Sequence, residues 1–470
     1  MLEGIVSCVK HAASLSENSY WITSLSKDKP QVQELKSAIV LHLGDLVKAE
    51  VKEGKIESAI ISEDPESVEF SRAAASAYAA KMILPFSKTG KGELDAVTAK
   101  MKQRLDESAS LFLKKLILGA PIIVRFHNDA DGLTGAYGLY LSIINLADKI
   151  SAAGLPKIFW KMQRGVAYSN SDAKEDILTV GNYDSNEKPL LLITDFGTTE
   201  ESLMGAQTAG EKFDIIWLDH HPPVEELTKL VELYTNPWNF EGNSNYTAGF
   251  LACEFGRRFA DIDLSLIQSA SLIGDYSGYA EDDEKGRELA LLLDMLTSDK
   301  KIAIASGSND ITPSEIDQIL NDEKRRNELT KYAKARIEEA IDSGIESIKQ
   351  YRTSDSNIYL LDFENVRKDA MTKYPLPGRY ASKLLERIEK MSDKPPILLL
   401  HFGHFISIRV SAPLVEKTNI LKTIGELKLG YSYIEGAGGH NSAASIKLRN
   451  DQNKKELINA LLRSLGCSIQ

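Results

Sequence analysis

Short apolar runs alternate with helical patterns between residues 121 and 300. The clearest runs are Pro121–Phe126, Leu190–Thr194 and Asp214–Leu218, and each is bounded by glycine, proline or charged residues. Short buried runs separated by helices indicate βαβ units and a parallel sheet. Each run ends in a polar cluster, and ligands bind beyond the carboxyl ends of the strands in such sheets. The pattern therefore predicts an α/β domain whose chemistry lies at one edge of its sheet.

The segment before this domain carries a long helical pattern at residues 91–117. Apolar residues recur there mostly at three- and four-residue steps, at Leu94, Val97, Met101, Leu105, Phe112 and Leu116. Residues 1–90 are less regular, with an apolar stretch near 38–46 and an alanine-rich helix near 71–83. We interpret residues 1–118 as an N-terminal extension or small domain that includes the helix at 91–117.

A second α/β domain is expected after the first. Residues 313–350 read as a long charged helix, whose basic segment at Lys324–Arg326 we interpret as part of a solvated connector rather than a nucleic-acid contact. The pattern then predicts strands at 357–363, 396–402 and 405–410. The predicted boundaries are an extension at 1–118, a first α/β domain at 119–305, a connector helix at 306–352 and a second α/β domain at 353–470.

Composition and charge exclude several classes of protein. The 470 residues are 43% hydrophobic and 26% charged, which is a globular balance. With 56 Lys and Arg against 67 Asp and Glu, the net charge of −11 excludes a protein that grips nucleic acid by bulk positive charge. The cysteines Cys8, Cys253 and Cys467 are too widely spaced for a zinc knuckle, and they fit a reducing compartment. Without an apolar run long enough to span a membrane or a secretory signal, we expect a soluble cytoplasmic protein that does not contact membranes.

Four polar clusters carry the candidate chemistry. They are the segment His127–Gly132 with Asp129 and Asp131, the strand-end Asp195, the triplet Asp219–His220–His221, and Asp275 after an apolar run. Several carboxylates at one sheet edge would repel one another unless cations lay between them. Mixed Asp and His ligands suit Mn²⁺, or Mg²⁺ with fewer imidazoles. A single Asp at a strand end is more often a helix cap or a turn former, so the metal interpretation depends on the clusters together.

Two features of the second domain suggest phosphate binding. Gly436–Gly439 is followed by His440 and by small residues, Ala443 and Ala444, that we expect to open a helix. Glycines let a backbone approach a phosphate closely and cradle it with exposed N–H groups, although a plain glycine loop is an open alternative. Arg409, in a predicted strand, could grip a phosphate with its fork of N–H donors or could be an ordinary surface arginine.

The four clusters, in this order, resemble those of the DHH phosphoesterase superfamily, which is named for the triplet found here at Asp219–His221. The resemblance covers about residues 121–280. It implies two divalent cations, Mn²⁺ or Mg²⁺, that are held by His127, Asp129, Asp131, Asp195, His220 and Asp275. It also implies that Asp219 braces the site and that His221 meets the substrate phosphate.

The subfamily resemblance is to RecJ-like members. Bacterial RecJ-like members carry a histidine where this chain has Arg125, whereas the position of His127 is that of the archaeal branch. The glycine motif is similar to the Gly-Gly-His motif of the substrate-binding domain in RecJ-like and oligonucleotide-degrading members. It implies that Arg409, Gly438, Gly439 and His440 bind substrate.

The resemblance implies an α/β fold in which a DHH domain with a mostly parallel sheet is joined to a smaller α/β substrate-binding domain, with the active site in the cleft between them. It implies a two-metal phosphodiesterase, namely a RecJ-like exonuclease on single-stranded DNA or RNA, with replication or repair proteins as partners. One alternative is a phosphodiesterase for short oligonucleotides, pAp or cyclic dinucleotides. The other is a non-catalytic replication or repair scaffold. The presence of all the ligand residues argues against this alternative.

Overall fold

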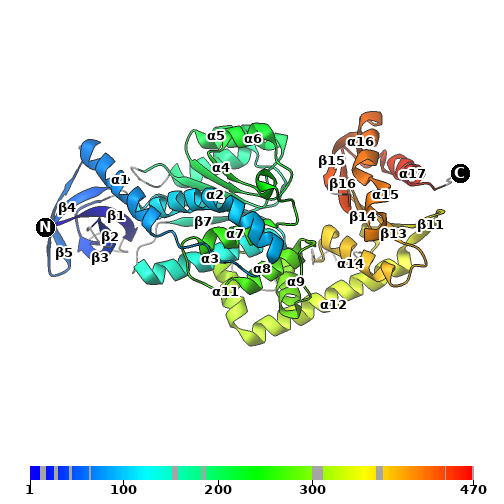
Figure 1. The fold of residues 1–470 in the computed structure, drawn as a ribbon, viewed down its shortest axis with the longest axis horizontal. Helices are drawn as coiled ribbons and strands as arrows, with labels where there is room; N and C mark the ends of the chain where they lie inside the picture. Colours follow the sequence, from blue (N-terminus) through cyan, green and yellow to red (C-terminus); the bar gives the residue numbers. More distant parts are fainter. Residues whose placement is uncertain are drawn as a thin grey trace. The chain divides into compact units, whose positions relative to one another are not determined.

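The computed structural model describes residues 1–10, 17–25, 30–41, 45–62, 65–150, 157–181, 183, 187–298, 311–366, 374–439 and 441–467. The chain divides into two compact units, Met1–Arg326 and Asn327–Gln470, each of which is described by itself (Figure 1). The domain boundaries inferred from the sequence stay predictions. None of the helices in the described part of the chain combines the length and the apolar character needed to cross a lipid bilayer.

The first unit begins with a closed five-stranded barrel, which the sequence patterns did not reveal (Figure 1). Its strands lie in the order β1-β2-β3-β5-β4. They are β1 (Leu2–Lys10), β2 (Asn18–Leu25), β3 (Pro30–Ser37), β4 (Leu46–Lys52) and β5 (Lys55–Ile61). Alternate residues fill the barrel, including Tyr20 and Ile22 of β2 with Val47 and Ala49 of β4.

Two helices connect the barrel to the rest of the unit. Helix α1 (Pro65–Lys81) packs against α2 (Gly92–Ile117), which lies within one residue of the helix predicted at 91–117. The apolar stripe of α2 is buried as its spacing predicted. Ala75 and Ala79 of α1 share one core with this stripe, and so does Ile5 of the barrel. The barrel is therefore packed onto the unit rather than tethered to it.

The centre of the unit is a five-stranded parallel sheet in the order β10-β9-β8-β6-β7. Its strands are β6 (Ile122–His127), β7 (Ile158–Gln163), β8 (Leu190–Thr194), β9 (Asp214–Leu218) and β10 (Leu233–Thr235). Strands covered on both faces read as continuous apolar runs, and β8 is buried at every position. This sheet confirms the predicted mostly parallel α/β architecture.

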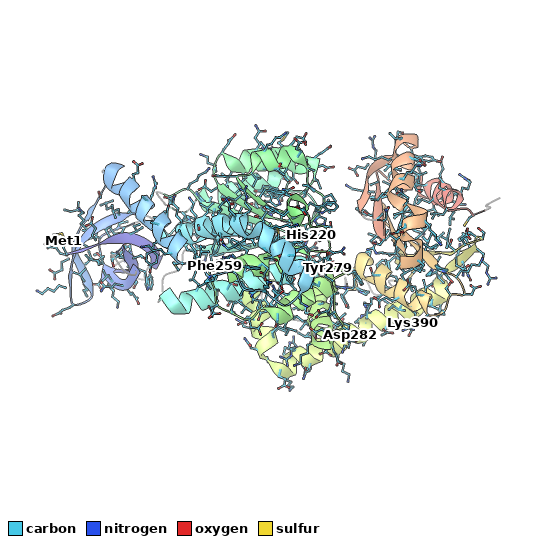
Figure 2. All side chains as sticks on the ribbon, in the orientation of Figure 1. Met1, His220, Phe259, Tyr279, Asp282 and Lys390 are labelled. Atoms are coloured by element: carbon cyan, nitrogen blue, oxygen red, sulfur yellow. The ribbon has the colours of Figure 1, made fainter. Side chains whose placement is uncertain are left out.

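Helices cover both faces of this sheet (Figure 1). One layer contains α3 (Ala130–Ile150), α7 (Ala248–Arg257) and α8 (Ser265–Gly274), and the other contains α4 (Asn170–Gly181), α5 (Leu203–Gly210) and α6 (Glu225–Leu230). Ile122 and Val124 of β6 pack into the first layer, while Ile123 packs into the second. Phe259, labelled in Figure 2, stacks on Phe112 of α2 with 5.4 Å between ring centroids. The unit ends with α9 (Glu284–Ser298), α11 (Pro313–Asn321) and the start of α12 (Glu323–Ser347).

The second unit is a smaller α/β structure around a mixed six-stranded sheet, in the order β11-β12-β13-β14-β16-β15. Only the β12–β13 pair is parallel among its described pairings. The strands are β11 (Lys349–Arg352), β12 (Asn357–Asp362), β13 (Pro396–Phe402), β14 (Phe405–Val410), β15 (Ile434–Gly439) and β16 (Ala443–Leu448). The main helices are α14 (Pro377–Glu389), α16 (Ile420–Gly430) and α17 (Lys454–Ser464).

One expectation about this unit was wrong. Ala443 and Ala444 do not open a helix, because they begin β16, which pairs antiparallel with the glycine-rich strand β15. Gly439 has a φ of 130°, and a Cβ there would come within 2.4 Å of the carbonyl oxygen of Ala443. The close approach of two strands explains this glycine, so small residues at this point mark a hairpin rather than a helix start.

Candidate metal centre

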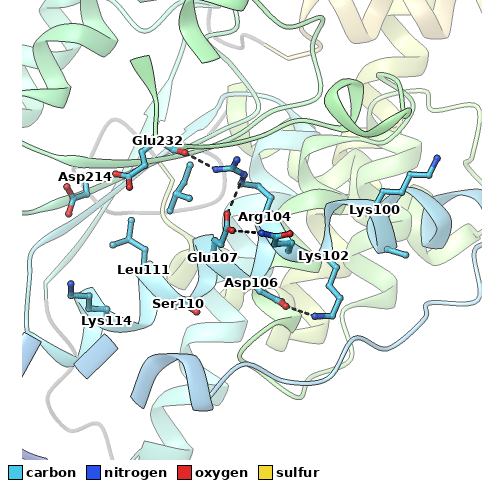
Figure 3. Close-up of a pocket in the computed structure, with 13 residues that line it drawn as sticks. Lys100, Lys102, Arg104, Asp106, Glu107, Ser110, Leu111, Lys114, Asp214 and Glu232 are labelled. Carbon is cyan, nitrogen blue, oxygen red and sulfur yellow. Dashed lines mark hydrogen bonds and ion pairs between the residues drawn. The ribbon is translucent and has the colours of Figure 1, made fainter. Parts of the chain in front are cut away.

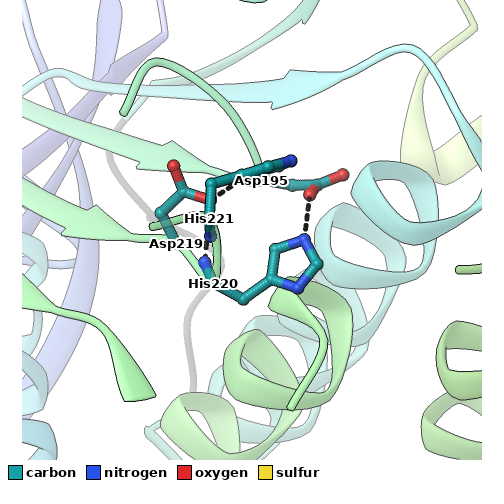
Figure 4. Close-up of side chains that lie close together, drawn as sticks. All are labelled: Asp195, Asp219, His220 and His221. Carbon is teal, nitrogen blue, oxygen red and sulfur yellow. Dashed lines mark hydrogen bonds and ion pairs between the residues drawn. The ribbon is translucent and has the colours of Figure 1, made fainter. Parts of the chain in front are cut away.

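The predicted ligands converge at the carboxyl ends of three adjacent strands. Phe126 of β6 is in register with Thr194 of β8, and Thr194 is in register with Leu218 of β9. The next residues along these three strands are His127, Asp195 and Asp219. Parallel strands in register therefore bring residues far apart in the sequence to one edge of the sheet. Figure 4 shows Asp195 beside the Asp219–His221 triplet.

Potential ligand atoms gather in three overlapping groups, in each of which they lie within 4.8 Å of one another. The groups are His127, Asp129 and Asp195; Asp131, His220 and Asp275; and Asp195, Asp219, His220 and His221. Asp195 and His220 each belong to two groups, and their Oδ1 and Nε2 atoms are 3.4 Å apart. All the predicted metal ligands thus lie in one connected cluster among the described residues.

Asp195 lies at the middle of this cluster in a strained conformation. Its φ of 68° is in the left-handed region, which costs a non-glycine residue about 1–3 kcal/mol. The side chain is buried, and its Oδ2 has no hydrogen-bond partner among the described residues. A buried carboxylate oxygen without a donor is costly, so this atom fits a position that a cation would satisfy.

The imidazole of His220 is oriented for metal binding. Its Nδ1 lies 2.7 Å from the carbonyl oxygen of Ser244, which can only accept, so Nδ1 carries the proton and donates it. The lone pair on Nε2 then points toward the carboxylate of Asp195, at 3.4 Å. A cation between Nε2 and the carboxylate would satisfy both atoms, and a backbone carbonyl that fixes the second nitrogen is the usual support of a ligating histidine.

Asp219 braces the triplet rather than facing solvent. Its Oδ1 accepts from the backbone N–H of His220 at 2.8 Å and from Nδ1 of His221 at 2.8 Å, while Oδ2 accepts from the hydroxyl of Thr198. Burial alone would raise the pKa of Asp219, but the charge and hydrogen bond of His221 outweigh it and lower the pKa to about 2. The side chain of His221 is 44% exposed, which leaves its ring accessible to a substrate.

The first motif combines ligand positions with helix caps. Asp129 accepts from the N–H of Gly132 at 2.9 Å, so it caps α3, and it also accepts from Nδ1 of His127 at 2.7 Å. Asp131 accepts from the first two N–H groups of α7, those of Ala248 at 2.8 Å and Gly249 at 3.1 Å. Each carboxylate oxygen has two lone pairs, so these bonds leave acceptor capacity for a cation.

The electrostatics of the cluster point to bound positive charge. Burial, together with the negative charge of Asp275, raises the pKa of Asp131 to about 7. Burial and the charges of Asp129 and Asp131 raise the pKa of Asp195 far above its ordinary value. Carboxylates that repel one another in a buried site are stabilised when divalent cations neutralise them. Oxygen and imidazole donors without any cysteine fit Mn²⁺ or Mg²⁺.

The predicted substrate-binding residues lie in the second unit. Arg409 of β14 donates to the hydroxyl of Ser407 at 3.0 Å, to that of Ser382 at 3.2 Å and to the carbonyl of Gly378 at 3.4 Å. Gly438 lies on β15, where an added Cβ would meet no atom within 4 Å, so the backbone there is approachable. Gly439 is at the end of the same strand, and His440 lies outside the described residues.

Several supporting residues were not identified from the sequence. Thr198 and Ser244 contact the triplet through their hydroxyl or carbonyl groups, and the hydroxyl of Ser271 donates to Asp131 at 2.5 Å. Trp238 donates its indole N–H to the carbonyl of His220 at 3.1 Å. Serines and threonines are common in loops, so only the tertiary contacts distinguish these residues.

A groove of about 1040 Å³ lies elsewhere on the first unit, along α2 (Figure 3). It adjoins Asp214 and Leu233, the first residues of β9 and β10, and so lies at the amino ends of strands whose carboxyl ends carry the metal centre. Its lining mixes basic with acidic side chains, and three of the basic ones have partners: Lys100 pairs with Glu241 at 2.6 Å, Lys102 pairs with Asp106 at 2.6 Å, and Arg104 donates to the carbonyl of Glu232 at 2.9 Å. This groove does not supply a basic track for nucleic acid.

No family model matches the chain. An uncharacterized protein of Methanocaldococcus jannaschii is 25% identical over 406 residues, which cover 75% of this chain and 52% of the relative. The chain thus spans about half the length of that curated relative.

Among solved structures, the DHH domain of a member of the s1p family of ribosomal proteins has a TM-score of 0.71 at 21% identity, over 85% of this chain and 98% of that one. RecJ from Thermus thermophilus in complex with Mn²⁺ has a TM-score of 0.44 at 15% identity, over 84% of this chain and 59% of RecJ. The first likeness shows that the chain has the fold of that DHH-domain structure, which confirms the fold predicted from the motifs.

Proposed function

We propose that this chain, which has a DHH-domain fold, is a divalent-metal-dependent phosphodiesterase that acts as a RecJ-like exonuclease on single-stranded nucleic acid. The observation that carries the proposal is the convergence of four separate motifs in one connected cluster, in which the buried Oδ2 of Asp195 has no hydrogen-bond partner among the described residues. Buried polar groups are usually hydrogen-bonded, so an unpaired carboxylate oxygen on a residue that two ligand groups share fits a cation site.

The roles of the residues follow from their contacts. His127, Asp129, Asp131, Asp195, His220 and Asp275 would hold two Mn²⁺ or Mg²⁺ ions. When bound, such cations supply the positive charge that activates water and neutralises a phosphate. Asp219 holds His221 through its Nδ1, at 2.8 Å, so that the opposite nitrogen is directed away from Asp219. We assign His221 to the substrate phosphate, because its ring is the exposed member of the triplet.

The second unit would contribute substrate binding. The guanidinium of Arg409 is held by two serine hydroxyls and two backbone carbonyls, so its planar fork is oriented before a ligand arrives. Its strand neighbour β16 pairs with β15, which carries Gly438 and Gly439. An oriented arginine two strands from an approachable glycine backbone suits an anionic group such as a phosphate or a chain terminus.

The proposal is tested with end-labelled single-stranded DNA and RNA of several lengths, each incubated with Mn²⁺, with Mg²⁺ or with excess chelator. Stepwise shortening that needs the cation would support an exonuclease. Cleavage of only the shortest strands would favour the short-oligonucleotide alternative. An unchanged substrate in every lane, with a metal-loaded and folded protein, would contradict a phosphodiesterase and favour a scaffold.

Arg409→Ala should separate substrate binding from metal binding. We expect KM for a single strand to rise about tenfold or more, because one charge-assisted contact to phosphate contributes about 1.5–3 kcal/mol. Metal content should stay unchanged, since the ligand groups belong to the first unit and Arg409 to the second. Lys447→Ala is the matched control, because it removes one positive charge from the neighbouring strand, where Lys447 pairs with Glu435 at 2.9 Å. Loss of metal in Arg409→Ala would contradict the assignment.

A further inference from the structure

One exposed aromatic residue is attached directly to the metal-binding triplet. Trp238 lies in a short 3₁₀ helix, Pro237–Phe240, that follows β10. Its side chain is 42% exposed, whereas Trp21 and Trp217 are buried. The indole N–H donates both to the carbonyl oxygen of His220 and to the hydroxyl of Ser244, each at 3.1 Å. The edge of the ring is thus fixed to the backbone of a predicted ligand, while much of the ring surface faces solvent.

The surrounding hydrogen bonds hold this ring rigidly. Asn236 accepts from the backbone N–H of Trp238 at 3.0 Å and donates to the carbonyl oxygen of His221 at 2.9 Å. Ser244 donates its hydroxyl to the carbonyl of His220 at 2.8 Å, and its own carbonyl accepts from Nδ1 of the same histidine. The same few residues therefore orient both the imidazole of His220 and the indole of Trp238, so the ring has a defined place relative to the metal centre.

An exposed tryptophan of this kind has a chemical use. Indole rings stack on nucleobases of any sequence, and aromatic platforms beside a phosphate-binding groove are how single strands are held without sequence preference. Solvent exposure of a single large apolar side chain is common and would by itself mean little. Here the exposed ring is also anchored through its N–H to His220, so its position is specified rather than incidental.

We propose that Trp238 is the stacking platform for a nucleobase of the substrate strand, next to the phosphate that is bound at the metal centre. The proposal rests on the proposed function, because only a nucleotide substrate carries a base beside its phosphodiester. It makes Trp238 a substrate-positioning residue that selects nucleic acid over phosphodiesters without bases.

The test compares two strands with the same phosphodiester backbone in the full-length protein: an oligothymidylate and an abasic strand of equal length. Trp238→Ala should raise KM for oligothymidylate about tenfold or more and leave KM for the abasic strand within about twofold, because stacking contributes only where a base is present. Trp238→Phe keeps an aromatic face and should retain most of the binding. Leu266→Ala, at an equally exposed apolar residue in the first turn of α8, is the matched control and should change neither value.

A readout without cleavage makes the two proposals distinguishable. Oligothymidylate added with Ca²⁺ should quench tryptophan fluorescence in the wild-type protein but much less in Trp238→Phe. If the wild type cleaves no strand, the proposed function is wrong. The fluorescence quenching then tests by itself whether Trp238 stacks on a base. Equal rises of KM on both strands, with reduced manganese content, would show that Trp238 only supports His220. That result, or an unchanged KM for oligothymidylate in Trp238→Ala together with unchanged quenching in Trp238→Phe, would overturn the platform.

Discussion

Replacing Asp195 with alanine is expected to abolish metal-dependent cleavage, with a fall in kcat/KM of about 10³-fold or more. Asp195 belongs to two of the three ligand groups, so its loss removes an oxygen donor from both sides of the cluster at once. Bound cations stabilise the transition state of phosphodiester hydrolysis by several kcal/mol, and each 1.36 kcal/mol corresponds to about tenfold in rate. Exhaustive chelation of the wild-type protein should have the same effect as the substitution.

The measurement pairs cleavage rates with the manganese content of each protein after dialysis. Asp261→Ala, which removes an exposed carboxylate in the loop between α7 and α8, is the control and should keep the wild-type cleavage rate and manganese content. Full activity in Asp195→Ala, or wild-type activity that survives chelation, would contradict the metal-dependent mechanism. Without cations, Asp195→Ala should be no less stable than the wild type, because alanine removes a buried carboxylate that its neighbours repel.

The candidate site was predictable because each of its motifs is local and its convergence follows from topology. A short apolar run such as Leu190–Thr194 predicts a buried parallel strand, and the residue after it must then lie at the carboxyl edge of the sheet. The sequence thus placed Asp195 at the same edge as the triplet, while the pairing of β8 with β9 that makes them neighbours is known from the structure. The capping of α7 by Asp131 was not predictable, because it joins residues 117 positions apart.

The barrel was missed for a related reason. Its strands do not form continuous apolar runs, as in β4, where Leu46, Val47 and Ala49 are buried but the other four residues are exposed. Closure also depends on pairings between distant segments, such as β1 with β4.

The prediction of a helix after Gly439 was wrong because small residues are compatible both with the start of a helix and with the close pairing of β15 and β16. Only the contact between the two strands distinguishes these structures. The sequence also could not predict which residues of β6 face which helix layer, because the run is apolar on both faces of the strand.

Arg125 departs from the bacterial RecJ-like pattern, and the structure gives it a different role from a ligand. Its guanidinium is buried and forms a bidentate pair with the buried Asp176 of α4, at 2.6 and 2.9 Å, and it donates to the side chain of Gln163 at 2.8 Å. These contacts join the end of β6 to α4 and to β7. The ion pair lies on the strand that ends at His127, so it supports the edge of the sheet on which the ligands lie.

Arg125→Met is therefore expected to lower the free energy of unfolding by about 1–3 kcal/mol, because the buried carboxylate of Asp176 loses its bidentate partner and keeps only Lys161, at 3.0 Å, and the hydroxyl of Tyr168. Arg125→Lys should lose less, since it keeps the charge but not the planar fork. The double variant Arg125→Met with Asp176→Asn should recover most of the loss, because the amide carries no charge, can still accept from the hydroxyl of Tyr168, and leaves Lys161 paired with Glu175 at 2.9 Å. Urea unfolding followed by circular dichroism measures all three variants. A single variant as stable as the wild type, or a double variant no better than Arg125→Met, would show that the ion pair does not hold β6 to α4.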